Sequence, residues 1–317
     1  MKYVGLQTQI DRNNRKSILL LIGFPLVLLG LVWLFFFAIN FFVSEEQRVF
    51  QMSDVNAQFV ISVPYVMTVV LIWFLIAWFS HSSMIRYATG AKPLERKSNK
   101  RVYNLVENLC MSKGMKMPKV FIINDNSLNA YASGLSDSSF AVTLSKGIIE
   151  RLDDDELEAV IAHELTHIRN RDVRLLIVSI IFVGIFSFVT ELAFRSLRFS
   201  GGSKKEKGTA IVLIVLVLGL LGLLLSSVFR FALSRKREFL ADAGAVEMTR
   251  KPMALASALK KVSKDPWIEA VKRDDVAQMF IEHPTPKKDR SSFSSMLGGM
   301  FATHPPIKER IKVLEQF

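Results

Sequence analysis

The sequence from Asp153 to Val173 reads DDDELEAVIAHELTHIRNRDV, and this stretch decides the fold. Acidic residues at its start are typical of the cap and the first turn of an α-helix, where negative charge is favoured. Apolar residues then follow at helical spacing and lead to the motif His163-Glu164-Leu165-Thr166-His167. We therefore expect one helix that begins near Asp153 and continues past Val173.

The two histidines of this motif lie about one turn apart on the same helix face, so both imidazoles can reach one metal ion. Glu164 lies beside them, where its carboxylate can accept a proton from water. Two imidazoles and a carboxylate with an open fourth position are the ligands of catalytic zinc. The motif predicts one zinc ion per chain and Glu164 as the general base. A purely structural histidine pair is disfavoured, because two of the chain's 5 histidines lie within these five residues.

Spacing does not fix the third protein ligand. The acidic candidates downstream are Asp172, Glu191, Glu238, Asp242 and Glu247. Glu238 and Asp242 are favoured because they lie four residues apart in a predicted helix. One carboxylate can then bind the metal while the other accepts a hydrogen bond from a ligand imidazole. Spacing leaves open which residue does which, and a surface salt bridge to nearby basic residues is the alternative.

Four long apolar segments surround this stretch, at residues 17–43, 59–80, 175–190 and 210–229. About 20 apolar residues cross a bilayer, so the first, second and fourth segments predict transmembrane helices. The third is short for a span, and a buried core helix is its alternative. The segments divide the chain into four regions. These are 1–80 with two spans, 81–174 with the zinc motif, 175–229 with two further segments, and 230–317 with the remaining ligand and a C-terminal helix.

Composition agrees with a membrane protein. Hydrophobic residues make up 50% of the chain and charged residues 22%, which excludes both a wholly soluble globule and a disordered chain. We attribute the net charge of +12 to basic residues that flank the spans, and not to nucleic-acid binding. The one cysteine, Cys110, cannot form an internal disulfide, and we expect it to be buried and inert.

Basic residues also predict the orientation. They precede the first span and follow the second, whereas the loop between these spans has only Arg48. The positive-inside rule then places the N-terminus and the block after residue 81 in the cytoplasm. The basic loop between the third and fourth segments, at 195–207, disagrees with an external location. Either these two segments form a shallow hairpin, or the earlier spans determine the topology.

The first hydrophilic block has an α+β pattern. Apolar residues at helical spacing predict a helix over 98–113 that Gly114 ends. Short apolar stretches predict strands at 118–124, 129–132 and 140–144.

The order of these motifs resembles the HtpX family of integral-membrane zinc metalloproteases, relatives of the type I CAAX prenyl proteases. The shared elements are His163-Glu164-x-x-His167, Glu238-x-x-x-Asp242, a late His304-Pro305 before a basic helix, and the edge-strand sequence Asn129-Ala130-Tyr131-Ala132. The resemblance implies that Glu238 is the third ligand and that Asp242 supports a ligand from behind. It also implies a multipass α-helical protein of the inner membrane, whose α+β, zincin-like protease domain faces the cytoplasm.

Two further roles complete the expected site. The edge strand formed by Asn129, Ala130, Tyr131 and Ala132 would bind substrate through main-chain hydrogen bonds. His304 would stabilise the oxyanion, with Tyr131 as a less supported donor. His283 and His304 both precede proline, but only His304 leads at once into the basic helix 307–314.

We therefore expect a zinc endopeptidase that cleaves unfolded or damaged membrane proteins. The resemblance alone supports the step to quality control and stress response. A specific processing peptidase is one alternative. A non-enzymatic membrane scaffold with a structural metal is another, although such a site has no use for a base at Glu164.

Overall fold

The structure is a computed structural model, and it describes residues 6–42, 50–199, 206–231, 235–265, 268, 279–281 and 305–316. The chain forms two compact units. One comprises Lys16–Phe79 and Val178–Phe229, and the other comprises Met1–Arg15, Ser80–Ile177 and Arg230–Phe317.

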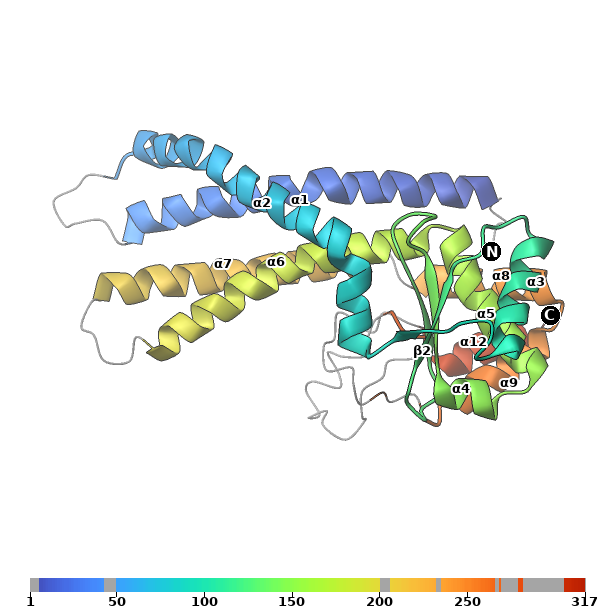
Figure 1. The fold of residues 1–317 in the computed structure, drawn as a ribbon. Coiled ribbons are helices and arrows are strands. Elements are labelled where there is room, and N and C mark those ends of the chain that lie inside the picture. The colour runs from blue at the N-terminus through green and yellow to red at the C-terminus, as the bar shows by residue number, and fades with distance from the viewer. Residues whose placement is uncertain are drawn as a thin grey trace. The chain divides into compact units, whose positions relative to one another are not determined.

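Four long helices contain the apolar segments: α1 (Leu6–Phe42), α2 (Met52–Thr89), α6 (Asp172–Phe199) and α7 (Glu206–Phe231) (Figure 1). Each includes a stretch long and apolar enough to cross a membrane, namely Asn14–Phe42, Met52–Thr89, Asp172–Ser196 and Gly208–Leu225. The predicted transmembrane helices are therefore confirmed by length and composition. The third segment, which looked short, belongs to a helix that extends beyond its apolar part at both ends.

Aromatic rings and small residues pack the helices of this first unit. The ring of Phe24 on α1 stacks on Phe182 of α6, with the centroids 4.0 Å apart. Gly219 and Gly222 on α7 lie against Thr190 and Phe186 of α6, so closely that a Cβ atom at either position would collide with them. Small residues at such points let helices approach closely, which is how membrane helices associate.

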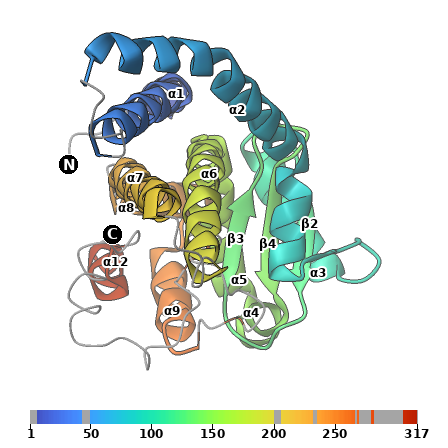
Figure 2. The ribbon, with the colours of Figure 1, turned by 90° about the vertical axis from the view of Figure 1, so that its left-hand side faces the viewer.

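A four-stranded sheet forms part of the second unit. It contains β1 (Lys92–Pro93), β2 (Lys119–Ile123), β3 (Ala130–Ser133) and β4 (Ala141–Ser145), in the order β1-β2-β4-β3. Strands β2 and β4 are parallel, and the other pairs are antiparallel. Figure 2 shows β3, β4 and β2 side by side. The three predicted strands are confirmed, and β3 is an edge strand of this sheet.

Helix α5 (Asp154–Arg169) is the centre of this unit. It packs against β3 and against α3 (Lys100–Ser112), α8 (Arg235–Thr249) and α9 (Pro252–Val262). A short helix, α4 (Lys146–Arg151), follows β4, and α12 (Ile307–Leu314) packs on α9 and α8. Leu157, Ile161 and Leu165 of α5 are fully buried. The motif helix therefore has its apolar face in the core, as its spacing predicts.

The N-terminus of α5 is anchored by Glu156. Its carboxylate accepts a hydrogen bond from the backbone N–H of Asp153, which completes a capping box. The same carboxylate accepts from Ser257 Oγ at 2.7 Å and from Lys261 Nζ at 2.6 Å, both on α9. Burial acts to raise the pKa of Glu156, but these hydrogen bonds outweigh it and lower the pKa. The start of the motif helix is thus fixed to α9.

The expected continuous helix from Asp153 past Val173 is wrong. Helix α5 ends at Arg169 and α6 begins at Asp172. Between them Arg171 has a φ of 61°, which lies in the left-handed region and cannot continue a right-handed helix. The chain therefore turns directly after the zinc motif. The sequence did not indicate this break, because glycine or asparagine, and not arginine, is the usual residue in this conformation.

Candidate metal centre

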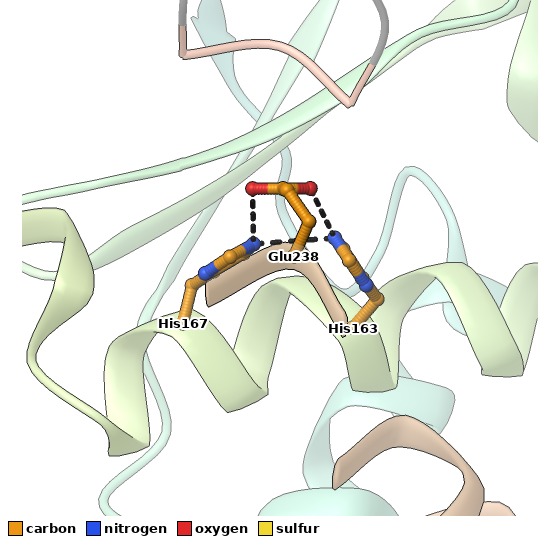
Figure 3. Close-up of side chains that lie close together, drawn as sticks. All are labelled: His163, His167 and Glu238. Carbon is orange, nitrogen blue, oxygen red and sulfur yellow. Dashed lines mark hydrogen bonds and ion pairs between the residues drawn. The ribbon is translucent and has the colours of Figure 1, made fainter. Parts of the chain in front are cut away.

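Three side chains converge in the second unit. His163 and His167 come from α5 and Glu238 from α8, and one ligand atom from each lies within 4.8 Å of the others (Figure 3). The two Nε2 atoms are 3.2 Å apart. Glu238 places Oε2 3.6 Å from His163 Nε2 and Oε1 3.5 Å from His167 Nε2.

These separations fit a single zinc ion. Tetrahedral zinc with nitrogen and oxygen ligands at about 2.0–2.1 Å places its ligand atoms about 3.4 Å apart. The two Nε2 atoms lie 3.2 Å apart, and each lies 3.5 or 3.6 Å from a different oxygen of Glu238, so the three residues can hold one ion between them. Three protein ligands leave a fourth position open, as in catalytic zinc sites.

A carboxylate lies behind each of the two histidines. His163 Nδ1 lies 3.0 Å from Asp242 Oδ1, and His167 Nδ1 lies 3.2 Å from Asp172 Oδ2. An ionised carboxylate can only accept, so in each neutral ring Nδ1 holds the proton and Nε2 offers its lone pair. Both lone pairs then point at the same place as the Glu238 carboxylate. This is the arrangement that ligand histidines have at zinc sites.

The site favours positive charge. Burial acts to lower the pKa of His163, but hydrogen bonds to Asp242 and Glu238 outweigh it and raise the pKa to about 9. In the metal-free protein the His163 ring therefore carries a second proton at neutral pH and is positively charged. The carboxylates that stabilise the proton would equally stabilise a divalent cation.

Arg310 is the residue that the sequence analysis missed. It lies on α12, is 0% exposed, and makes two hydrogen bonds to Asp242, at 2.9 Å from Nε and 2.6 Å from Nη2. Burial acts to raise the pKa of Asp242, but Arg310 lowers it to about 2. Asp242 thus stays ionised and stays in place against His163. Arg310 shares a helix face with Leu314 and Ile307, and a lone arginine on a half-apolar face was the available signal.

Glu164 is buried beside the cluster, with 2% of its surface exposed. Burial raises the pKa of its carboxyl group, and the nearby histidines act in the opposite direction. A carboxylate in such a dry site accepts a proton more readily than one on the surface.

The other acidic candidates lie elsewhere. Glu191 pairs with Arg195 at 2.8 Å, and Glu247 pairs with Arg169 at 2.8 Å. Asp172 contacts His167 from behind. Of the five candidates, Glu238 is the one that joins the metal-binding cluster.

The predicted edge strand, β3, contacts residues 279–281 along the edge that faces away from β4. Asn129 lies just before β3, and Ala130 to Ala132 lie in it, all of them buried. Tyr131 forms an antiparallel bridge with Phe280, and the N–H of Ile281 donates to the carbonyl of Ala130 at 2.9 Å. The Tyr131 hydroxyl lies 2.9 Å from Thr89 Oγ1.

His304, the predicted oxyanion donor, and His283 lie outside the described residues. The role of His304 stays a prediction. Pro305, which follows it, is described and buried.

The chain is similar to known proteases over nearly its whole length. The sequence profile of Peptidase family M48 matches residues 96–317. A protease HtpX homolog of Bacteroides fragilis is 56% identical, with 100% of both chains covered. A protease HtpX homolog of Lactobacillus helveticus is 34% identical and covers 98% of this chain and 99% of its own. The crystal structure of S. mikatae Ste24p aligns with a TM-score of 0.47 at 18% identity, over 96% of this chain and 67% of that one.

The cluster predicts a ranking of zinc loss. Glu238→Ala should abolish zinc binding, because it leaves only two protein ligands, the imidazoles of His163 and His167. Asp242→Asn keeps the shape behind His163 but removes the charge, and should weaken zinc binding roughly 10–100-fold. Zinc content and affinity of the detergent-purified variants measure both effects. Glu247→Ala, a surface carboxylate on the same helix, is the control and should bind zinc normally. A larger loss for Asp242→Asn than for Glu238→Ala would contradict the assignment.

Proposed function

The chain belongs to peptidase family M48, within the HtpX proteases, and we propose that this integral membrane zinc metalloprotease degrades unfolded or damaged membrane proteins at the cytoplasmic face. The observation that best supports an active enzyme is the cluster of His163, His167 and Glu238 with the buried Glu164 beside it. A purely structural metal site needs no further carboxylate at that position. The proposed physiological setting is quality control and stress response in the inner membrane.

The residues of the chain divide the chemistry among them. Zinc, when bound, supplies a Lewis acid that polarises the scissile carbonyl and makes water more acidic. Glu164 accepts the proton of the attacking water on its carboxylate and returns it to the leaving amine. Burial of Glu164 suits this exchange, because it raises the pKa of the carboxyl group and so makes the carboxylate a stronger base. His304 would donate to the developing oxyanion.

Substrate would bind to β3 as an added strand. Main-chain hydrogen bonds select an extended chain and not a particular side chain, which suits unfolded proteins. One edge of β3 pairs with β4 and the other contacts residues 279–281 at Ala130 and Tyr131. A substrate strand at these two residues would therefore have to displace residues 279–281. This segment of the chain would compete with substrate.

The proposed base is tested by Glu164→Gln. We expect this variant to keep its zinc, because Glu164 is not a ligand, and to lose casein cleavage by roughly 10²–10⁴-fold. Glu158→Gln, on the same helix, is the control and should cleave normally. Cleavage near the wild-type rate by Glu164→Gln would contradict the mechanism. Cleavage of one native partner, but not of unfolded casein, would favour a processing peptidase.

The proposed competition at β3 is tested by Ile281→Pro. Proline has no N–H, so the hydrogen bond to the carbonyl of Ala130 is lost, at a cost of about 1 kcal/mol. If residues 279–281 compete with substrate, KM for an unfolded peptide should fall by roughly 2–10-fold. Ile281→Val keeps the N–H and is the control. A higher KM, with zinc content unchanged, would show that the segment supports the site instead of competing for it.

The proposed orientation is tested by cysteine labelling. Cys110 is 1% exposed and can be replaced, and single cysteines at Lys97 and Arg250 then report on the protease block. Both should be protected from an impermeant maleimide in intact cells and be labelled after lysis, because lysines and arginines favour the cytoplasm. Gln51→Cys, between the first two spans, should be labelled from outside. External labelling at Lys97 or Arg250 would reverse the orientation.

A further inference from the structure

The turn that ends the zinc helix also contributes to the zinc site. Helix α5 ends two residues after His167, and α6 begins at Asp172. Asp172 is 3% exposed, and its Oδ2 lies 3.2 Å from His167 Nδ1. Asp172 is also the first residue of the candidate membrane span Asp172–Ser196. The start of a membrane helix thus contacts a metal ligand directly.

A second contact brings the other ligand helix to the same residue. The backbone carbonyl of Asp172 accepts a hydrogen bond from Arg237 Nη1 at 3.3 Å. Arg237 directly precedes Glu238 on α8. Asp172 therefore contacts His167 through its side chain and the neighbour of Glu238 through its backbone.

Arg171 gives the turn its shape. A non-glycine residue in the left-handed region costs roughly 1–2 kcal/mol, so something must favour this conformation. Arg171 Nη1 donates to Asp137 Oδ1 at 2.7 Å, and its guanidinium lies 5.1 Å from the centre of the Phe140 ring. Asp137 and Phe140 belong to the connection between β3 and β4. This connection therefore holds the arginine in its strained backbone conformation.

We propose that Asp172 is a positioning residue for the metal, and that Arg171, held by Asp137 and Phe140, sets the turn that places it. Asp172 would fix the ring of His167 just as Asp242 fixes the ring of His163, so that each ligand imidazole has its own carboxylate. The inference rests on the zinc site and is independent of the proposed substrate.

The role of Asp172 can be measured without any substrate. Affinity for zinc is followed by competition with a chromophoric chelator, and ligand geometry by the visible spectrum of the Co²⁺-loaded protein. We expect Asp172→Asn to weaken zinc binding roughly 10–100-fold and to change the cobalt spectrum, and Asp172→Ala to bind more weakly still. Asp265→Asn removes an exposed ion pair with Arg151 and should change neither readout. Unchanged affinity and spectrum in both Asp172 variants would overturn the proposal.

The role of Arg171 is separated from a general loss of stability by two substitutions. Arg171→Gly removes the ion pair but adopts the left-handed conformation without strain, so zinc affinity should stay within about 2-fold of wild type. Arg171→Ala keeps the strain without the contacts that offset it, and should bind zinc several-fold more weakly. Equal zinc affinities of the glycine and alanine variants would refute the role of the turn. Because neither readout uses peptide cleavage, failure here is distinct from failure of the proposed protease function.

Discussion

The structure depends on one electrostatic constraint, which is the concentration of carboxylates around the imidazoles of His163 and His167. Glu164, Glu238, Asp242 and Asp172 are all nearly buried, and an isolated buried charge costs several kcal/mol. The protein meets this cost with hydrogen bonds from Arg310 to Asp242, with contacts from both histidine rings, and with a cluster that a divalent cation fits. Asp242 depends on these neighbours in particular, because Arg310 lowers its pKa.

The elements that meet this constraint come from distant parts of the sequence. Helix α5 precedes the second pair of membrane helices, whereas α8 and α12 follow it. Because Asp242 on α8 contacts both His163 and Arg310, a single carboxylate links all three helices. The backbone at Gly244 permits this closeness, since a Cβ there would collide with Thr166 of α5. The close packing of α5 on α8 therefore also brings the metal ligands together.

The sequence pattern predicted those features that depend on residues close together in the chain. Apolar length indicates the membrane helices, and the spacing of His163 and His167 indicates the metal. Period-two and period-3.6 patterns cannot show the break at Arg171, because an arginine gives no sign of a left-handed backbone. The burial of Arg310 and the pairing of Phe280 with Tyr131 were also not predictable, since each is decided by residues far away in the sequence. Spacing alone could not decide between Glu238 and Asp242 as the third ligand. The family resemblance implied Glu238, and the geometry of the structure places Glu238 in the cluster.

Metal and proton compete for the same position in this site. The pKa of about 9 for His163 means that the metal-free protein holds a proton there at neutral pH, where the ordinary value of 6.5 would leave most rings neutral. A metal ion has to displace that proton, so binding becomes weaker as the pH falls below about 9. Asp242 remains ionised throughout, because Arg310 keeps its pKa at about 2. The carboxylate that orients His163 toward the metal is thus the same one that retains the proton in its absence.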